Sequence, residues 1–190
     1  MKTLINPRTG ILAAMILSAG AWRLFITSGH SPLTNFTPIG AMALFGGYYF
    51  ADRWKAFLVP ILTLWLSDLF LSYFVYYHEW RWFYDGFVFT YGSFALMVMI
   101  GRFIKKVNIK NVILTGVLAA LLHWIITDFG VWLDGRIYQM NFKGFVACYV
   151  AALPYLQNML IANLVFGAIM FGVFELAQRK FPVLSLNNAQ

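Results

Sequence analysis

One mostly apolar stretch, residues 56–77, limits most strongly what this chain can fold into. It reads AFLVPILTLWLSDLFLSYFVYY, and Asp68 is its only ionisable side chain before the closing tyrosines. At about 1.5 Å per residue, a helix of this length covers about 33 Å, enough to cross a hydrocarbon core of about 30 Å. A carboxylate deep in such a span costs roughly 2.5–3.5 kcal/mol on insertion scales, so the fold must give Asp68 polar partners.

The composition of the whole chain agrees with a membrane protein. Hydrophobic residues make up 61% of it and charged residues 11%, whereas charged residues are about 25% of soluble domains. The 190 residues leave room for about six helices with short connections and for no separate soluble domain. We therefore expect a single transmembrane domain over residues 1–190.

The net charge of +7 is explained by membrane topology rather than by nucleic acid. Ten of the fourteen Lys and Arg residues fall at alternate ends of the apolar stretches, as the positive-inside rule requires of cytoplasmic segments. These ten are Lys2, Arg8, Arg53, Lys55, Arg102, Lys105, Lys106, Lys110, Arg179 and Lys180. The other four, Arg23, Arg81, Arg136 and Lys143, belong to the opposite side. No nucleic-acid partner is expected.

The apolar stretches predict an all-α, polytopic bundle of six transmembrane helices with both termini in the cytoplasm. The expected helices are residues 10–27, 37–50, 56–77, 87–104, 111–133 and 155–177. Residues 28–38 form the first outside loop, and the helix that follows them barely spans the core. Residues 144–154 are apolar but too few to cross, which predicts a re-entrant or interfacial segment.

Polar side chains from four of these helices are expected at one depth, in the outer half of the bundle, while the inner half is almost wholly apolar. They are Arg23, Asp68, His123, Asp128, Asn158 and Asn163. Ionisable groups at such depth usually mark a substrate or ion path, which predicts a pocket open to the outside. His123 and Asp128 lie about 140° apart around a helix, so one is expected to line the pocket and the other to bond a neighbouring helix. Arg23 either snorkels to the interface or pairs with a carboxylate.

Residues 78–86 are rich in aromatic side chains. Trp80, Trp82, Phe83 and Tyr84 are typical of an interfacial aromatic belt, and the same rings could cover a flat ligand.

The chain has no zinc-protease, nucleophile-elbow, phosphate-loop or Cys-x-x-Cys motif. Its single cysteine, Cys148, excludes an intramolecular disulfide and a cysteine-only metal site. We expect no enzyme, cofactor or metal.

Several runs resemble a known group of proteins. NFTPIGAMALFGG (35–47), the Ser67–Asp68 pair, TDFGVWL (127–133) and CYVAALPYLQN (148–158) resemble a bacterial family of uncharacterised six-span membrane proteins. The layout also resembles the substrate-binding S components of energy-coupling-factor vitamin transporters. That resemblance implies a subunit of the bacterial cytoplasmic (inner) membrane that captures a micronutrient and docks on a transmembrane coupling subunit with ATPases.

The resemblance also implies a docking stripe on the first helix. Gly10, Ala14 and Ser18 recur every four residues, and such stripes let helices approach closely, either inside the bundle or at a partner. S components present an alanine pair to the coupling subunit at this place, where the present chain has a Gly/Ala/Ser series.

The leading hypothesis is therefore capture of a small nutrient, such as a vitamin or its precursor, from the outer side. The expected substrate-binding residues are Asn35 in the lid-forming first loop, Asp68 and Asn158 as a polar floor, Tyr84 and Trp132 as stacking walls, and His123 and Asp128. One alternative is a structural protein resembling the small membrane subunit of the cell-shape machinery, in which Arg23 and Asp68 only pair. Another is a proton-coupled solute carrier with Asp128 and His123 as relay. Each of the three also implies contact with membrane lipid.

Overall fold

The computed structural model describes residues 6–27 and 35–185, and all regular structure in these two ranges is helical, as expected. The elements are α1 (Pro7–Thr27), α2 (Ile39–Tyr49), α3 (Arg53–Leu71), the π-helical turn η1 (Ser72–Tyr76), α4 (Phe87–Arg102), α5 (Ile109–Asp134), α6 (Phe142–Ala151), α7 (Leu153–Lys180) and the 3₁₀ turn η2 (Pro182–Leu184).

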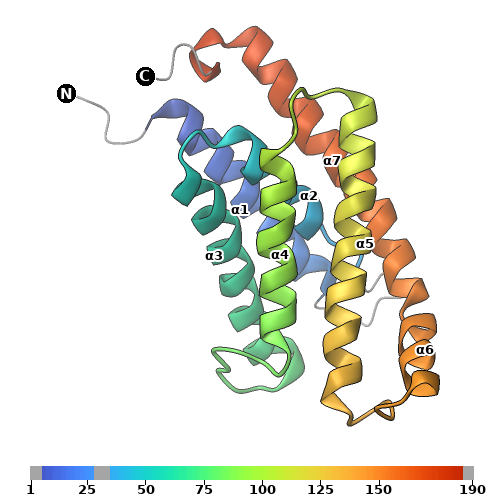
Figure 1. Cartoon of the computed structure of the whole chain (residues 1–190). Coiled ribbons are helices and arrows are strands. Elements are labelled where there is room, and N and C mark those ends of the chain that lie inside the picture. The colour runs from blue at the N-terminus through green and yellow to red at the C-terminus, as the bar shows by residue number, and fades with distance from the viewer. Residues whose placement is uncertain (1–5, 28–34, 186–190) are drawn as a thin grey trace.

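The chain runs back and forth between two ends of an elongated bundle (Figure 1). One end holds the start of α1, residues 50–55, residues 102–110 and the end of α7; we call it the basic end, because nine Lys and Arg residues of these segments lie there. The opposite end holds residues 77–86 and 134–142 and is called the aromatic end. A hydrogen bond from Arg8 to the Leu184 carbonyl ties the first described residues to the last at the basic end.

Within residues 6–27 and 35–185, four helices are long and apolar enough to cross a membrane. They are α1 with 21 residues, the continuous helix Arg53–Tyr76 with 24, α5 with 26 and α7 with 28. Their outward faces are apolar: on α5, one exposed stripe consists of Leu114, Leu118, Leu121 and Ile125. A stripe of this length in contact with solvent would be unusual in a soluble protein, so these faces fit a lipid environment.

Two of the six expected spans are shorter than predicted. The fourth, α4, has 16 residues, and the second, α2, has only 11. The expected interfacial segment at residues 144–154 is divided between α6, which has 10 residues, and the first turn of α7. Length and composition thus support four crossings directly.

The short helix α2 occupies the centre of the bundle. Nine of its eleven residues are buried. It contacts α4 through glycines on both helices, since a Cβ at Gly47 would overlap the Val98 carbonyl oxygen and one at Gly101 would overlap that of Leu44. Backbone-to-backbone contact of this kind is how small residues let membrane helices approach closely.

Candidate functional site

Asp68 is held in a polar cluster that joins three helices near the aromatic end. Its Oδ1 lies 2.6 Å from Nη2 of Arg23 on α1, and the two side chains are 9% and 15% exposed. Arg23 also donates through Nη1 to the Ser67 hydroxyl. The Tyr91 hydroxyl of α4 donates to Asp68 Oδ2 at 2.8 Å. Of the two expectations for Arg23, pairing with an intramembrane carboxylate is the one observed.

Tyr84, in the segment before α4, lies between this cluster and a cavity at the aromatic end. Burial and then the neighbouring Asp68 carboxylate raise the pKa of Tyr84 to about 12. Its ring is half-buried and lines the cavity. Tyr84 is therefore a neutral group that lines the cavity and lies close enough to Asp68 for the carboxylate to affect its pKa.

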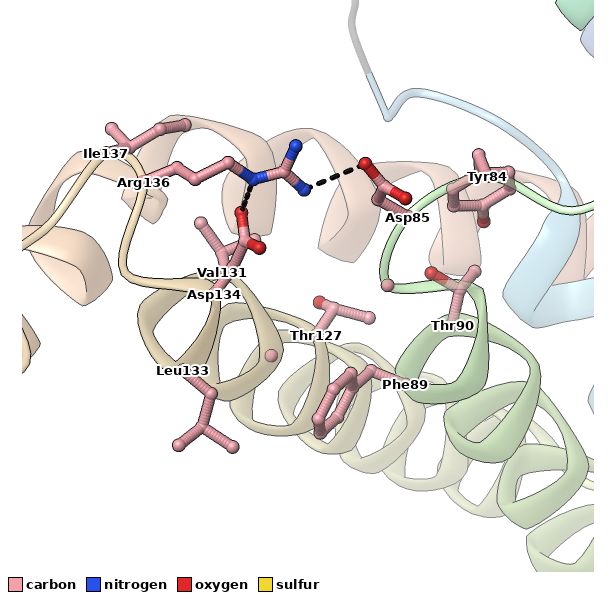
Figure 2. Close-up of a pocket in the computed structure, with 12 residues that line it drawn as sticks. Tyr84, Asp85, Phe89, Thr90, Thr127, Val131, Leu133, Asp134, Arg136 and Ile137 are labelled. Carbon is pink, nitrogen blue, oxygen red and sulfur yellow. Dashed lines mark hydrogen bonds and ion pairs between the residues drawn. The ribbon is translucent and has the colours of Figure 1, made fainter.

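The cavity has a volume of about 440 Å³ and lies between the start of α4 and the end of α5 (Figure 2). Its lining residues are Tyr84, Asp85, Gly86, Phe89, Thr90, Thr127, Gly130, Val131, Leu133, Asp134, Arg136 and Ile137. Gly130 allows the two helices to meet, because a Cβ there would overlap the ring of Phe89. The wall thus combines aromatic and aliphatic surface with a few hydroxyl groups.

An arginine between two carboxylates lies along one side of this cavity. Arg136 Nε donates to Asp134 Oδ2 at 2.5 Å, and its Nη2 donates to Asp85 Oδ2 at 2.8 Å. Figure 2 shows the guanidinium between the two carboxylates, with Thr127 and Phe89 on the other side of the cavity. Hydrogen bonds to Asp134 and then Asp85 raise the pKa of Arg136. The three side chains carry a net charge of −1 and link the end of α5 to the segment before α4.

His123 and Asp128 point to different neighbours, as their angular separation on the helix predicts. His123 Nδ1 is hydrogen-bonded to the Ser93 hydroxyl of α4 at 2.8 Å. Cys148 Sγ of α6 donates to the Asp128 backbone carbonyl at 3.4 Å, and the Asp128 carboxylate is close enough to Cys148 and Tyr149 of α6 to interact with both electrostatically. The structure therefore does not bring His123 and Asp128 together as a relay.

The bonds described above for the Asp68 cluster involve none of Trp132, Asn158 and Asn35. The indole N–H of Trp132 donates to the Gln139 carbonyl at 3.2 Å, and its ring packs edge-on against Phe145 of α6. Asn158 is half-buried in α7. Asn35 is exposed in a turn before α2, with a left-handed φ of 66°. The expected lid lies mostly in residues 28–34, outside the described residues.

The remaining polar residue of the expected group and the small-residue stripe have separate places. Asn163 is buried and donates to the Gly116 carbonyl at 2.9 Å, which joins α7 to α5. Ala14 and Ser18 are exposed on α1, whereas Gly10 is half-buried. The stripe is thus accessible over most of its length.

A buried polar cluster lies at the basic end, where the sequence had predicted an almost wholly apolar inner half, so that prediction was wrong. Arg8 is 4% exposed and donates to the Tyr49 carbonyl and to Gln178 Oε1, both at 2.9 Å, and to the Leu184 carbonyl. The Tyr49 hydroxyl donates to Glu175 Oε1 at 2.6 Å. The available signal was Glu175, an acidic residue within an apolar helix.

The comparisons with known proteins give one match. Residues 3–184 match a family of unknown function, DUF6580. This confirms the resemblance to an uncharacterised family over nearly the whole chain. No curated protein and no solved structure matches the chain.

Proposed function

We propose that this chain, which belongs to the DUF6580 family of unknown function, is a membrane-embedded subunit that captures a small micronutrient. The observation that carries the proposal is the cavity of about 440 Å³ at the aromatic end. Ligand pockets typically measure about 300–1,000 Å³ and combine apolar walls with a few placed polar groups. Phe89 and Val131 supply apolar wall, while Thr90 and Thr127 supply hydroxyls.

The orientation follows from the charges. With the basic end in the cytoplasm, the positive-inside rule places the cavity at the outer surface of a bacterial cytoplasmic membrane. The chain then crosses six times, α2 and α4 being the two short crossings, and both termini are cytoplasmic. Short helices are tolerated where neighbouring helices enclose them, and α2 is enclosed.

A partner must energise uptake in this proposal, because the sequence has no phosphate-binding loop. We place a transmembrane coupling subunit with ATPases against α1, where Ala14 and Ser18 are exposed. This arrangement is that of the S components of energy-coupling-factor transporters. The ligand class is a vitamin or a precursor of one.

The role of Asp68 in capture is indirect. Both of its carboxylate oxygens already have partners in the protein, because Arg23 forms an ion pair with Oδ1 and the Tyr91 hydroxyl donates to Oδ2. Tyr84 is the group between Asp68 and the cavity, so Asp68 acts on the ligand by positioning the helices and the electrostatics around that ring. Tyr84 is the wall that contacts the ligand.

Purification of the full chain from its native membranes, followed by mass spectrometry of co-purifying small molecules, tests the proposal. Thr127→Trp should fill the cavity and remove the ligand. Leu118→Trp, on the exposed face of the same helix, is the matched control and should retain it. If the wild-type protein yields no small molecule and binds no member of a vitamin panel, the proposal is wrong.

A structural role is the second candidate, and the Arg23–Asp68 pair favours it. A buried pair with both carboxylate oxygens occupied can serve only to fix helix packing. Under that role, replacing the pair by Met and Leu should preserve cell shape and growth, since apolar replacement of a buried pair is often neutral. Loss of nutrient uptake in the same cells, with the protein still folded, would favour capture.

A further inference from the structure

We propose that the ligand of the aromatic-end cavity is a small organic cation whose positive group takes the place of the Arg136 guanidinium between Asp85 and Asp134. This inference rests on the proposed capture function and names the chemical class of its substrate.

The charge of the cavity wall is the first argument. Among the described residues that line it, the charged side chains are two carboxylates and one guanidinium, so this part of the wall carries a net charge of −1. Tyr84 stays neutral, since its pKa is raised to about 12. An anion would meet this net negative wall, and it would have to draw Arg136 away from both carboxylates. A cation of the same shape as the guanidinium head satisfies the carboxylates directly.

The exposure of the three charged groups is the second argument. Arg136, Asp85 and Asp134 are 61%, 77% and 42% exposed, so the guanidinium can leave its place without rearrangement of the core. Exposed ion pairs contribute little to stability and are easily exchanged. The Arg136 side chain therefore occupies the polar position while no ligand is bound.

The wall behind the carboxylates is the third argument. Tyr84 and Phe89 present aromatic rings to the cavity, and aromatic faces attract cations. Val131 and Leu133 provide aliphatic surface for an apolar body. The ligand that fits is a protonated amine or a cationic heterocycle that carries an apolar group.

The test uses the full-length protein in phosphatidylcholine nanodiscs and three probes of similar shape: 3-phenylpropylammonium, 3-phenylpropanol and 3-phenylpropionate. Isothermal titration should detect binding of the cation and weaker or no binding of the alcohol and the carboxylate. Asp134→Asn should weaken cation binding by roughly two- to fivefold, the effect of losing one exposed charge pair. Arg136→Gln should strengthen it by a similar factor, because the competing guanidinium is gone.

The matched control is Arg81→Gln, since Arg81 is an exposed arginine at the same end, is paired with Glu79, and does not line the cavity. It should leave the affinity for the cation unchanged. Two results would show that the ligand is not a cation while leaving capture intact. One is loss of cation binding in Arg136→Gln. The other is tighter binding of the carboxylate or the alcohol than of the cation, provided that Thr127→Trp blocks it. A neutral or anionic molecule recovered from native membranes would do the same. If no probe binds and no molecule is recovered, capture itself is refuted.

Discussion

Removal of the Asp68 carboxylate should destabilise the folded protein more than almost any other single change near the aromatic end. In Asp68→Leu, the Arg23 guanidinium loses its carboxylate partner and keeps, among the described residues, its bond to Ser67, in a position where its side chain is 15% exposed. Breaking a buried pair by removing one partner costs about 3–5 kcal/mol, because the other charge stays buried. We expect a loss of unfolding free energy in that range.

A double substitution distinguishes the interaction between Arg23 and Asp68 from the interactions of each side chain with its surroundings. Arg23→Met combined with Asp68→Leu removes both charges, and such apolar replacements are often neutral or stabilising by about 1–4 kcal/mol. Removal of the two charges together should therefore not by itself lower the unfolding free energy. The Tyr91 hydroxyl loses its acceptor in this variant, and that loss costs about 1–3 kcal/mol. The coupling energy between the two positions should be about 3 kcal/mol or more.

Reversible unfolding in mixed micelles with an increasing fraction of dodecyl sulfate, followed by tryptophan fluorescence, measures these differences. Glu79→Gln is the control, because Glu79 is 70% exposed and pairs with Arg81 at 3.6 Å. It should change the unfolding free energy by less than about 0.5 kcal/mol. Additive effects of the two single substitutions, with a coupling energy near zero, would show that Arg23 and Asp68 do not interact and would refute the reasoning.

Three further predictions concern other parts of the fold. Gly47→Ala forces the α2 and α4 backbones apart and should lower the melting temperature, whereas Gly172→Ala, which meets no atom within 4 Å, should leave it unchanged or higher. Arg8→Met removes the bond to the last described turn, so trypsin should cleave after Lys180 faster than in the wild type. The Tyr84 pKa of about 12 lies above the ordinary value of about 10, so the neutral Tyr84 hydroxyl stabilises the fold fully below pH 10, and this stabilisation is lost as the pH rises to 12. Denaturant titrations should therefore show that Tyr84→Phe loses less stability than the wild type between pH 10 and pH 12.

The sequence predicted the need for partners at Asp68 because a lone carboxylate in an apolar span is unfavourable. It also named Arg23 as one candidate, since both lie in the outer parts of their helices. Tyr91 was not foreseen, because a tyrosine in an apolar helix is compatible with simple packing and gives no signal of its own. The helix period separated His123 from Asp128 as expected, but neither is among the described residues that line the cavity, although one of them was expected to be.

The common depth of the polar residues did not predict their assembly. Depth is one coordinate, whereas contact also depends on the direction in which each helix face points. Asn163 and Trp132 therefore bond other helices and loops at their own positions. The arginine between Asp85 and Asp134 could not be predicted either, because loop charges separated by about fifty residues have no periodic pattern.

The central position of α2 has a consequence for how the protein is made. An eleven-residue helix with nine buried residues has almost no surface to offer to lipid, and its three glycines, at residues 40, 46 and 47, weaken it as an isolated segment. It cannot settle in the bilayer when it first leaves the ribosome, before the segments that enclose it have been synthesised. In the proposed six-span arrangement, insertion of this chain therefore ends with a late step in which the second hydrophobic segment is drawn in among helices made after it.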